Sequence, residues 1–117
     1  SPDFPVYLQW LHYAEGMLMM PMGQIVVETI LLPPERRSEE HAMRAKKLLG
    51  RLLGAAEQHM NGREYLAGDF SAADTITGHA VMMCARLGTD MTGMDNLAGY
   101  IDRLKARPAL QKALAIE

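Results

Sequence analysis

The sequence has 117 residues and a formal net charge of −2, and 49% of its residues are hydrophobic while 22% are charged. This length fits one domain with a real core, and the composition is ordinary for a globular chain. No surplus of positive charge is present to neutralise phosphates, which argues against a nucleic-acid partner. The single cysteine excludes an internal disulfide and fits a reducing compartment, so we expect a cytoplasmic protein.

The longest weakly charged run, residues 16–27, contains Pro21 and Gly23 and is too short to span a bilayer. We therefore expect no membrane partner. Ten methionines are many for a chain of this length. Four of them cluster in this run: Met17, Met19, Met20 and Met22.

Apolar residues recur at helical spacing from the start of the chain. Residues 1–5 contain two prolines and form the expected lead-in, and a first helix is predicted over about 6–32. Pro21 removes one backbone donor and is expected to kink this helix near its middle, and two consecutive prolines end it. One face of this helix carries Trp10, Tyr13, Met17 and Met20 at spacings of three and four.

Four further helices follow. The second is predicted from Glu35 or Ser38 to Met60, the third over 71–88, the fourth around 97–105, and a short last helix from Pro108. The core stripe of the second helix consists of Ala42, Ala45, Leu49, Leu52, Leu53, Ala56 and Met60. No alternating run typical of a strand is present. The chain is therefore predicted to be one all-α domain over 1–117, a bundle of about five helices without a sheet.

The third helix begins with a capping box. Ser71 is placed to accept, through its hydroxyl, from the backbone N–H three residues on, and Asp74 to accept in return from the Ser71 N–H. The residues that follow are apolar around most of the helix, with one face formed by Ala73, Ile76, Thr77, Ala80, Cys84 and Leu87. Such a helix is buried, and its first N–H groups must be satisfied by the cap.

No active site is evident in the sequence. The four histidines, His12, His41, His59 and His79, do not have the spacing of metal ligands, so scattered structural histidines are favoured over a metal site. Cys84 lies on the apolar face of the buried helix, where a thiol is usually inert. We therefore assign no catalytic residue and no metal ligand.

Three motifs resemble one known family. The run from Tyr65, Tyr-Leu-Ala-Gly-Asp-Phe-Ser-Ala-Ala-Asp, resembles the capping-box segment in the C-terminal domain of cytosolic glutathione transferases. Residues 7–15 resemble the opening of the fourth helix in bacterial members, and residues 97–114 resemble the last two helices. The motifs occur in family order and span nearly the whole chain.

The resemblance implies a two-domain parent enzyme. In that family a thioredoxin-like N-terminal domain binds the co-substrate glutathione and stabilises its thiolate, and the helical domain supplies most of the pocket for a hydrophobic electrophile. This sequence begins where the helical domain begins, so the thioredoxin-like domain is expected to be absent and the chain alone inactive. A fragment of a longer enzyme is favoured over a natural standalone domain. The family also implies a homodimer.

The resemblance places the functional residues on the first helix. Tyr13, Met17 and Met20 are the expected electrophile-binding residues, with core or interface packing as the alternative, and Glu15 is a candidate contact to glutathione of a neighbouring subunit, with a solvated surface acid as the alternative. Met19 and Met20 stand where some bacterial members carry a His-Lys pair, so the resemblance implies a contribution of shape from this helix and no polar group near the sulfur. The alternative function is a non-enzymatic interaction module, as in translation factors, synthetase assemblies and intracellular chloride channel proteins.

Overall fold

The computed structural model describes residues 3–116, which form helices and no strand. The nearest approach to a sheet within these residues is an isolated bridge between Tyr65 and Gly68. The elements are α1 (Phe4–Tyr13), the π-helical η1 (Ala14–Leu18), α2 (Met19–Val26), the π-helical η2 (Val27–Leu31), the 3-10 turn η3 (Pro34–Arg36), α3 (Glu39–His59), the π-helical η4 (Asp74–Gly78), α4 (His79–Arg86), α5 (Asp95–Lys105) and α6 (Pro108–Leu114). Because α1 to η2 are contiguous and η4 continues into α4, these elements make the predicted five-helix, all-α architecture.

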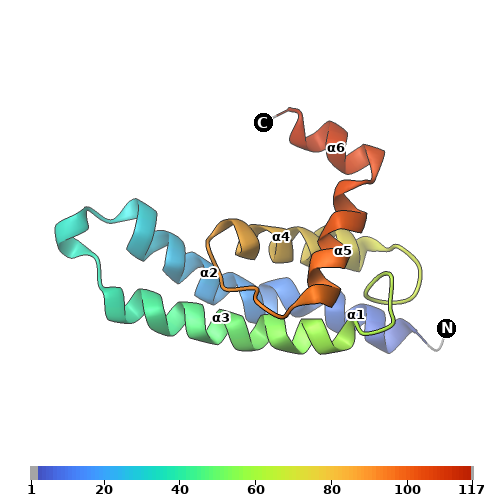
Figure 1. The fold of residues 1–117 in the computed structure, drawn as a ribbon, viewed down its shortest axis with the longest axis horizontal. Coiled ribbons are helices and arrows are strands. Elements are labelled where there is room, and N and C mark those ends of the chain that lie inside the picture. The colour runs from blue at the N-terminus through green and yellow to red at the C-terminus, as the bar shows by residue number, and fades with distance from the viewer. Residues whose placement is uncertain (1–2, 117) are drawn as a thin grey trace.

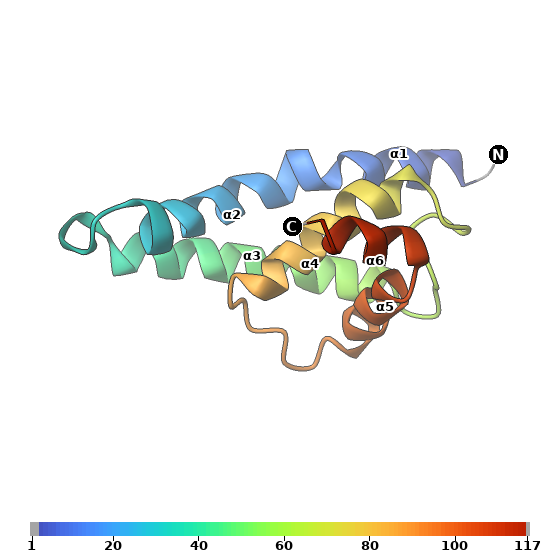
Figure 2. The same ribbon diagram turned by 90° about the horizontal axis from the view of Figure 1, so that it is seen from above.

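The longest structural unit is an antiparallel hairpin of the first helix, α1 to η2, and α3 (Figures 1 and 2). The other helices, α4, α5 and α6, gather at the end of the hairpin that holds α1 and the last turns of α3. The opposite end, with η2 and the first turns of α3, projects beyond them, which gives the molecule its elongated extents of 50 × 30 × 24 Å. No helix in the described part of the chain is long and apolar enough to cross a bilayer.

The first helix differs from its prediction at its start. It begins at Phe4, and Pro5 lies in its first turn, where a missing N–H leaves no bond unmade. The prediction of a lead-in through residue 5 was therefore wrong for residues 4 and 5, while residues 1 and 2 lie outside the described part. The helix continues through Pro21, directly after the π-helical turn η1, in which the Met19 N–H donates to the Ala14 carbonyl.

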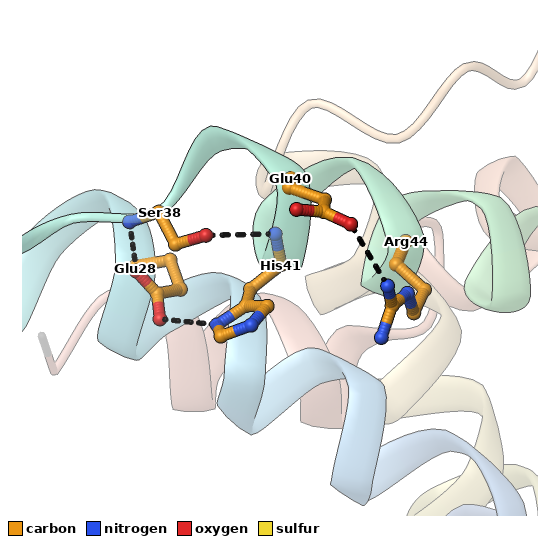
Figure 3. Close-up of polar contacts among 5 residues, drawn as sticks. All are labelled: Glu28, Ser38, Glu40, His41 and Arg44. Atoms are coloured by element: carbon orange, nitrogen blue, oxygen red, sulfur yellow. Dashed lines mark hydrogen bonds and ion pairs between the residues drawn. The ribbon is translucent and has the colours of Figure 1, made fainter.

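The projecting end of the hairpin is closed by Glu28, which is 8% exposed (Figure 3). Its Oε2 accepts the Ser38 N–H at 2.6 Å, and its Oε1 lies 3.6 Å from Nδ1 of His41. Ser38 caps α3 by accepting the His41 N–H on its hydroxyl at 3.1 Å. The nearby pair of Glu40 and Arg44, 3.1 Å apart, is exposed and contributes little to stability.

The core runs along the hairpin and under α4 and α5. The predicted stripe of α3 is buried except for Leu52, which is partly buried and packs against the core. The residues with no exposed surface in the described chain come from four of the helices: Leu18, Leu49, Leu53, Ala56, Ala73, Thr77, Cys84, Leu97 and Tyr100. Burial of these apolar side chains is the main favourable contribution to folding.

The helix formed by η4 and α4 is buried along one side only, so the prediction that it is buried around most of its circumference was wrong. Of the predicted face, Ala73, Thr77, Ala80 and Cys84 are buried, Leu87 is partly buried, and Ile76 is 46% exposed. The π-helical turn Asp74–Gly78 adds a residue to this turn, which shifts the angular position of Ile76 away from the core. Val81 and Met82 are buried beside it.

Candidate functional site

The start of η4 is organised around the carboxylate of Asp74, which is 1% exposed. Oδ1 accepts a hydrogen bond from the Leu66 N–H at 3.0 Å and another from the Tyr100 hydroxyl at 2.6 Å. Oδ2 accepts the Ser71 N–H at 3.0 Å. One side chain therefore joins the loop before η4, the start of η4 and the middle of α5.

Only one of the two hydrogen bonds expected of the capping box is present. The expected bond from the Ser71 N–H to Asp74 is made, but the Ser71 hydroxyl has no hydrogen-bond partner among residues 3–116. The Asp74 N–H, which this hydroxyl was expected to accept, donates instead to the Ser71 carbonyl at 3.0 Å. The prediction for the Ser71 side chain was therefore wrong, because the backbone carbonyl satisfies the same donor.

Close packing surrounds this network. A Cβ atom on Gly78 would lie 2.7 Å from Cδ1 of Leu104 and 2.8 Å from the Tyr100 hydroxyl. The hydroxyl of the adjacent residue, Thr77, donates to the carbonyl of Trp10. Burial, together with the bond to Asp74, raises the pKa of Tyr100. This hydroxyl therefore stays protonated and acts as a permanent donor.

A cavity of about 420 Å³ lies beside the network, between η4 and α4 on one side and the end of α5 and α6 on the other. Its walls are largely apolar and include two groups able to carry positive charge. The lining residues are Phe70, Asp74, Thr75, His79, Met82, Leu104, Arg107, Ala109, Leu110 and Ala113.

Arg107 is held in place by two aromatic residues. Its Cζ lies 3.5 Å from the centroid of the Phe70 ring, and Nη1 donates to the Tyr65 hydroxyl at 3.3 Å. The two rings meet edge to face at 5.5 Å. Cation–π contacts of this kind stabilise a guanidinium without neutralising its charge. The cavity thus has an apolar body and a fixed cation.

The three predicted electrophile-binding residues of the first helix differ in their exposure to solvent. Tyr13 is partly buried: its hydroxyl donates to the Leu52 carbonyl at 2.8 Å, its ring packs 4.5 Å from that of Trp10, and burial raises its pKa. Met17 and Met20 are 52% and 81% exposed. None of the three lines the 420 Å³ cavity. We call Met17, Met19 and Met20 the methionine surface; Glu15, also exposed, lies on the same stretch of helix.

The remaining candidate groups have structural roles. Cys84 is fully buried, and burial raises its pKa to about 12, so its thiol is not a nucleophile at neutral pH. His59 stacks on Trp10 at 4.4 Å, and its Nε2 lies 2.6 Å from the Leu66 carbonyl oxygen. Among residues 3–116 no three acidic, histidine or cysteine side chains group to hold a metal ion.

Two residues of this region were not singled out from the sequence as site residues. Tyr100 was recognised as a member of an apolar stripe, and its hydroxyl was not assigned a partner. A buried tyrosine hydroxyl requires one, so the sequence did contain a signal for the bond to Asp74. Arg107 becomes part of a cavity wall through the way α6 follows α5 and faces α4 across the cavity, for which the sequence gives no signal.

The family model described as "Glutathione S-transferase, C-terminal domain" matches residues 18–108. Solved structures of similar fold include a glutathione transferase from Pseudomonas putida with glutathione disulfide bound, at 23% identity and a TM-score of 0.86, covering 97% of this chain and 51% of that chain. Another, from Burkholderia graminis with two glutathione molecules bound per subunit, has 26% identity and a TM-score of 0.81, covering 92% and 48%.

A third, from Phanerochaete chrysosporium in complex with oxidized glutathione, has 20% identity and a TM-score of 0.85, covering 98% of this chain and 54% of that chain. This chain therefore spans about half the length of these proteins. Among curated protein sequences, no significant match is found.

Proposed function

This chain belongs to the glutathione S-transferase C-terminal domain family, and from that premise we propose that it is the helical half of a two-domain glutathione transferase. The parent enzyme joins the thiolate of glutathione to a hydrophobic electrophile. Support comes from the three glutathione transferases described above, of which this chain matches about half. In this proposal the other half is a thioredoxin-like domain, which holds glutathione and supplies the catalytic residue.

The observation that carries the proposal is the exposure of Met17 and Met20, at 52% and 81%, on a helix whose opposite side is packed into the core. Methionine side chains are flexible and polarisable, and they adapt to apolar ligands of varied shape. Tyr13 anchors this part of the helix through its bond to the Leu52 carbonyl. The methionine surface then forms one wall of the electrophile pocket, and the missing domain forms the other.

Two further parts of the proposal concern assembly. The parent acts as a cytoplasmic homodimer, and Glu15 approaches glutathione bound to the neighbouring subunit. An exposed carboxylate suits this role because glutathione carries an ammonium group.

Catalysis is proposed to require the other domain. Thiolate chemistry needs a group that lowers a thiol pKa and holds the sulfur near the electrophile. The cysteine of this chain has its pKa raised to about 12 and is fully buried. We therefore expect the chain alone to show no glutathione conjugation.

The test mixes the chain with glutathione and an aryl halide, and separately titrates it with each. We expect no turnover above the uncatalysed rate and weak binding of the aryl halide. The variant Met20→Lys weakens that binding, whereas Met43→Lys, which changes another exposed methionine, 70% exposed on α3, does not. Turnover by the chain alone, or tighter binding of glutathione than of the aryl halide, contradicts the proposal. A parent chain without a thioredoxin-like domain would instead favour the interaction module.

A further inference from the structure

We propose that the cavity between η4–α4 and α5–α6 is a second binding site, separate from the methionine surface, for a small aromatic anion. Its volume of about 420 Å³ lies within the range of roughly 300–1,000 Å³ that is typical of small-molecule pockets. The apolar part of the ligand packs between Met82 on one wall and Leu104, Leu110 and Ala113 on the other. This inference does not rest on the proposed transferase function.

The charge of the ligand follows from Arg107. This side chain is only partly exposed, and its guanidinium lies over the Phe70 ring, with Cζ 3.5 Å from the ring centroid. Within the described residues its hydrogen bond is the one from Nη1 to Tyr65, and no carboxylate lies within ion-pair distance. A guanidinium has five N–H donors, in a geometry that matches a carboxylate. The remaining donors are therefore available to an anion in the cavity.

Asp74, the acidic residue in the cavity wall, forms no ion pair with Arg107. Asp74 is 1% exposed, and its two oxygens accept three hydrogen bonds from Leu66, Ser71 and Tyr100. Donors of this kind stabilise the carboxylate where it lies. These hydrogen bonds explain why Asp74 lies in the wall. The charge of Arg107 remains available to a ligand.

The experiment compares 2-naphthoate with its neutral analogue 2-naphthamide by isothermal titration calorimetry on the protein and its variants. We expect the protein to bind the carboxylate about tenfold more tightly than the amide, in line with a charge-assisted hydrogen bond. Arg107→Gln removes this preference and leaves amide binding within twofold (about 0.4 kcal/mol). Lys112→Gln removes one charge from α6, the helix that Arg107 precedes, at a residue outside the lining, and it changes neither affinity.

A second variant tests the location. Ala113 lines the cavity and is exposed, so Ala113→Trp fills the cavity from α6 without disturbing the core, and it should abolish binding of both probes. Circular dichroism checks that each variant keeps its helices. The proposal is overturned by equal binding of the two probes, by unchanged binding in Ala113→Trp, or by no binding at millimolar concentration. Binding lost in Met20→Gln but retained in Ala113→Trp also overturns it and assigns the probe to the methionine surface.

Discussion

The hydroxyl of Tyr100 donates a hydrogen bond of 2.6 Å to Oδ1 of Asp74, across 26 positions of sequence. Both side chains are at most 1% exposed. The bond fixes α5 against the start of η4, and the same carboxylate also holds the backbone of Leu66 and Ser71. Because the carboxylate has three buried or partly buried donors, its loss affects several parts of the fold together.

We predict that Asp74→Ala destabilises the fold severely. The change leaves the Leu66 N–H and the Tyr100 hydroxyl buried without an acceptor, and each such group costs about 1–3 kcal/mol. The sum is a large share of the ~5–15 kcal/mol by which a typical domain is stable. Urea denaturation followed by circular dichroism measures the loss. A midpoint equal to that of the unchanged protein contradicts the role given to Asp74.

Two variants serve as controls for that measurement. Ser71→Ala should change the free energy of unfolding by less than about 0.5 kcal/mol, although removal of a working N-cap costs about 0.5–2 kcal/mol, because its hydroxyl has no partner in the described chain. Tyr100→Phe should cost less than Asp74→Ala, since Asp74 retains two N–H donors and no donor is left buried.

A second prediction concerns the close approach of η4 to α5. Gly78→Ala should lower the free energy of unfolding by about 1–3 kcal/mol, because the new methyl group meets Leu104 and the Tyr100 hydroxyl. Gly50→Ala is the matched control, since nothing lies within 4 Å of its added Cβ. There alanine should stabilise α3 by up to about 1 kcal/mol. Equal effects of the two substitutions in thermal unfolding would show that the contacts of a methyl group at Gly78 do not lower the stability of the fold.

The order and type of the helices could be predicted from the sequence, because apolar spacing, prolines and glycines mark them locally. Pro108 begins α6, and Gly62, with φ +74°, follows α3. One error arises where the helix is not ideal. Ile76 was assigned to the core face by a 3.6-residue period, but it lies within a π-helical turn.

The candidate sites could be predicted in part only. Tyr13, Met17 and Met20 share a face of an ideal helix, but η1 widens the helix directly after Tyr13, and Tyr13 is partly buried while the methionines are exposed. The cavity beside Arg107 depends on how α6 packs after the turn at Pro108. Such a long-range arrangement leaves no periodic signal in the sequence.

A third prediction concerns pH. Burial lowers the pKa of His59 below its ordinary value of about 6.5, and Arg63 acts in the same direction. The unfolded chain therefore binds this proton more readily than the folded chain. Stability should fall as the pH drops through about 6.5 toward the folded pKa, and it should be retained above that value.

The check is urea denaturation at about pH 7.5 and about pH 5.5. His59→Gln should reduce the difference in unfolding free energy between the two pH values. His12→Gln, which changes a histidine exposed on α1, should leave it as it is. A His59 variant with an undiminished pH dependence would assign the effect to other groups.

A fourth prediction concerns the projecting end of the hairpin. Glu28→Ala removes the acceptor of the Ser38 N–H, so the first turn of α3 should open more often, at a cost of about 1–3 kcal/mol. Faster amide hydrogen exchange over residues 38–44 should report this opening. His41→Gln should cost less than about 0.5 kcal/mol, because the imidazole is 52% exposed and its pair with Glu28 is weak. Unchanged exchange in Glu28→Ala would remove Glu28 as the residue that closes this end.

The last prediction concerns the outer side of the first helix, through which we expect the chain to associate with itself. Trp10 and Met22 lie in the core, but this one helix exposes Phe4, Leu8, Met17, Met19, Met20, Val27, Ile30 and Leu31. Apolar surface of this extent on a small protein usually marks an interface. Sedimentation velocity should show a species larger than a monomer at micromolar concentrations.

The double variant Met20→Lys and Ile30→Lys should shift this species toward the monomer, because burying two unpaired ammonium groups in an interface is unfavourable. Met43→Lys, on α3, tests whether any added charge has this effect. A monomer at all these concentrations that also fails to bind a hydrophobic dye would show that this surface is not an interface.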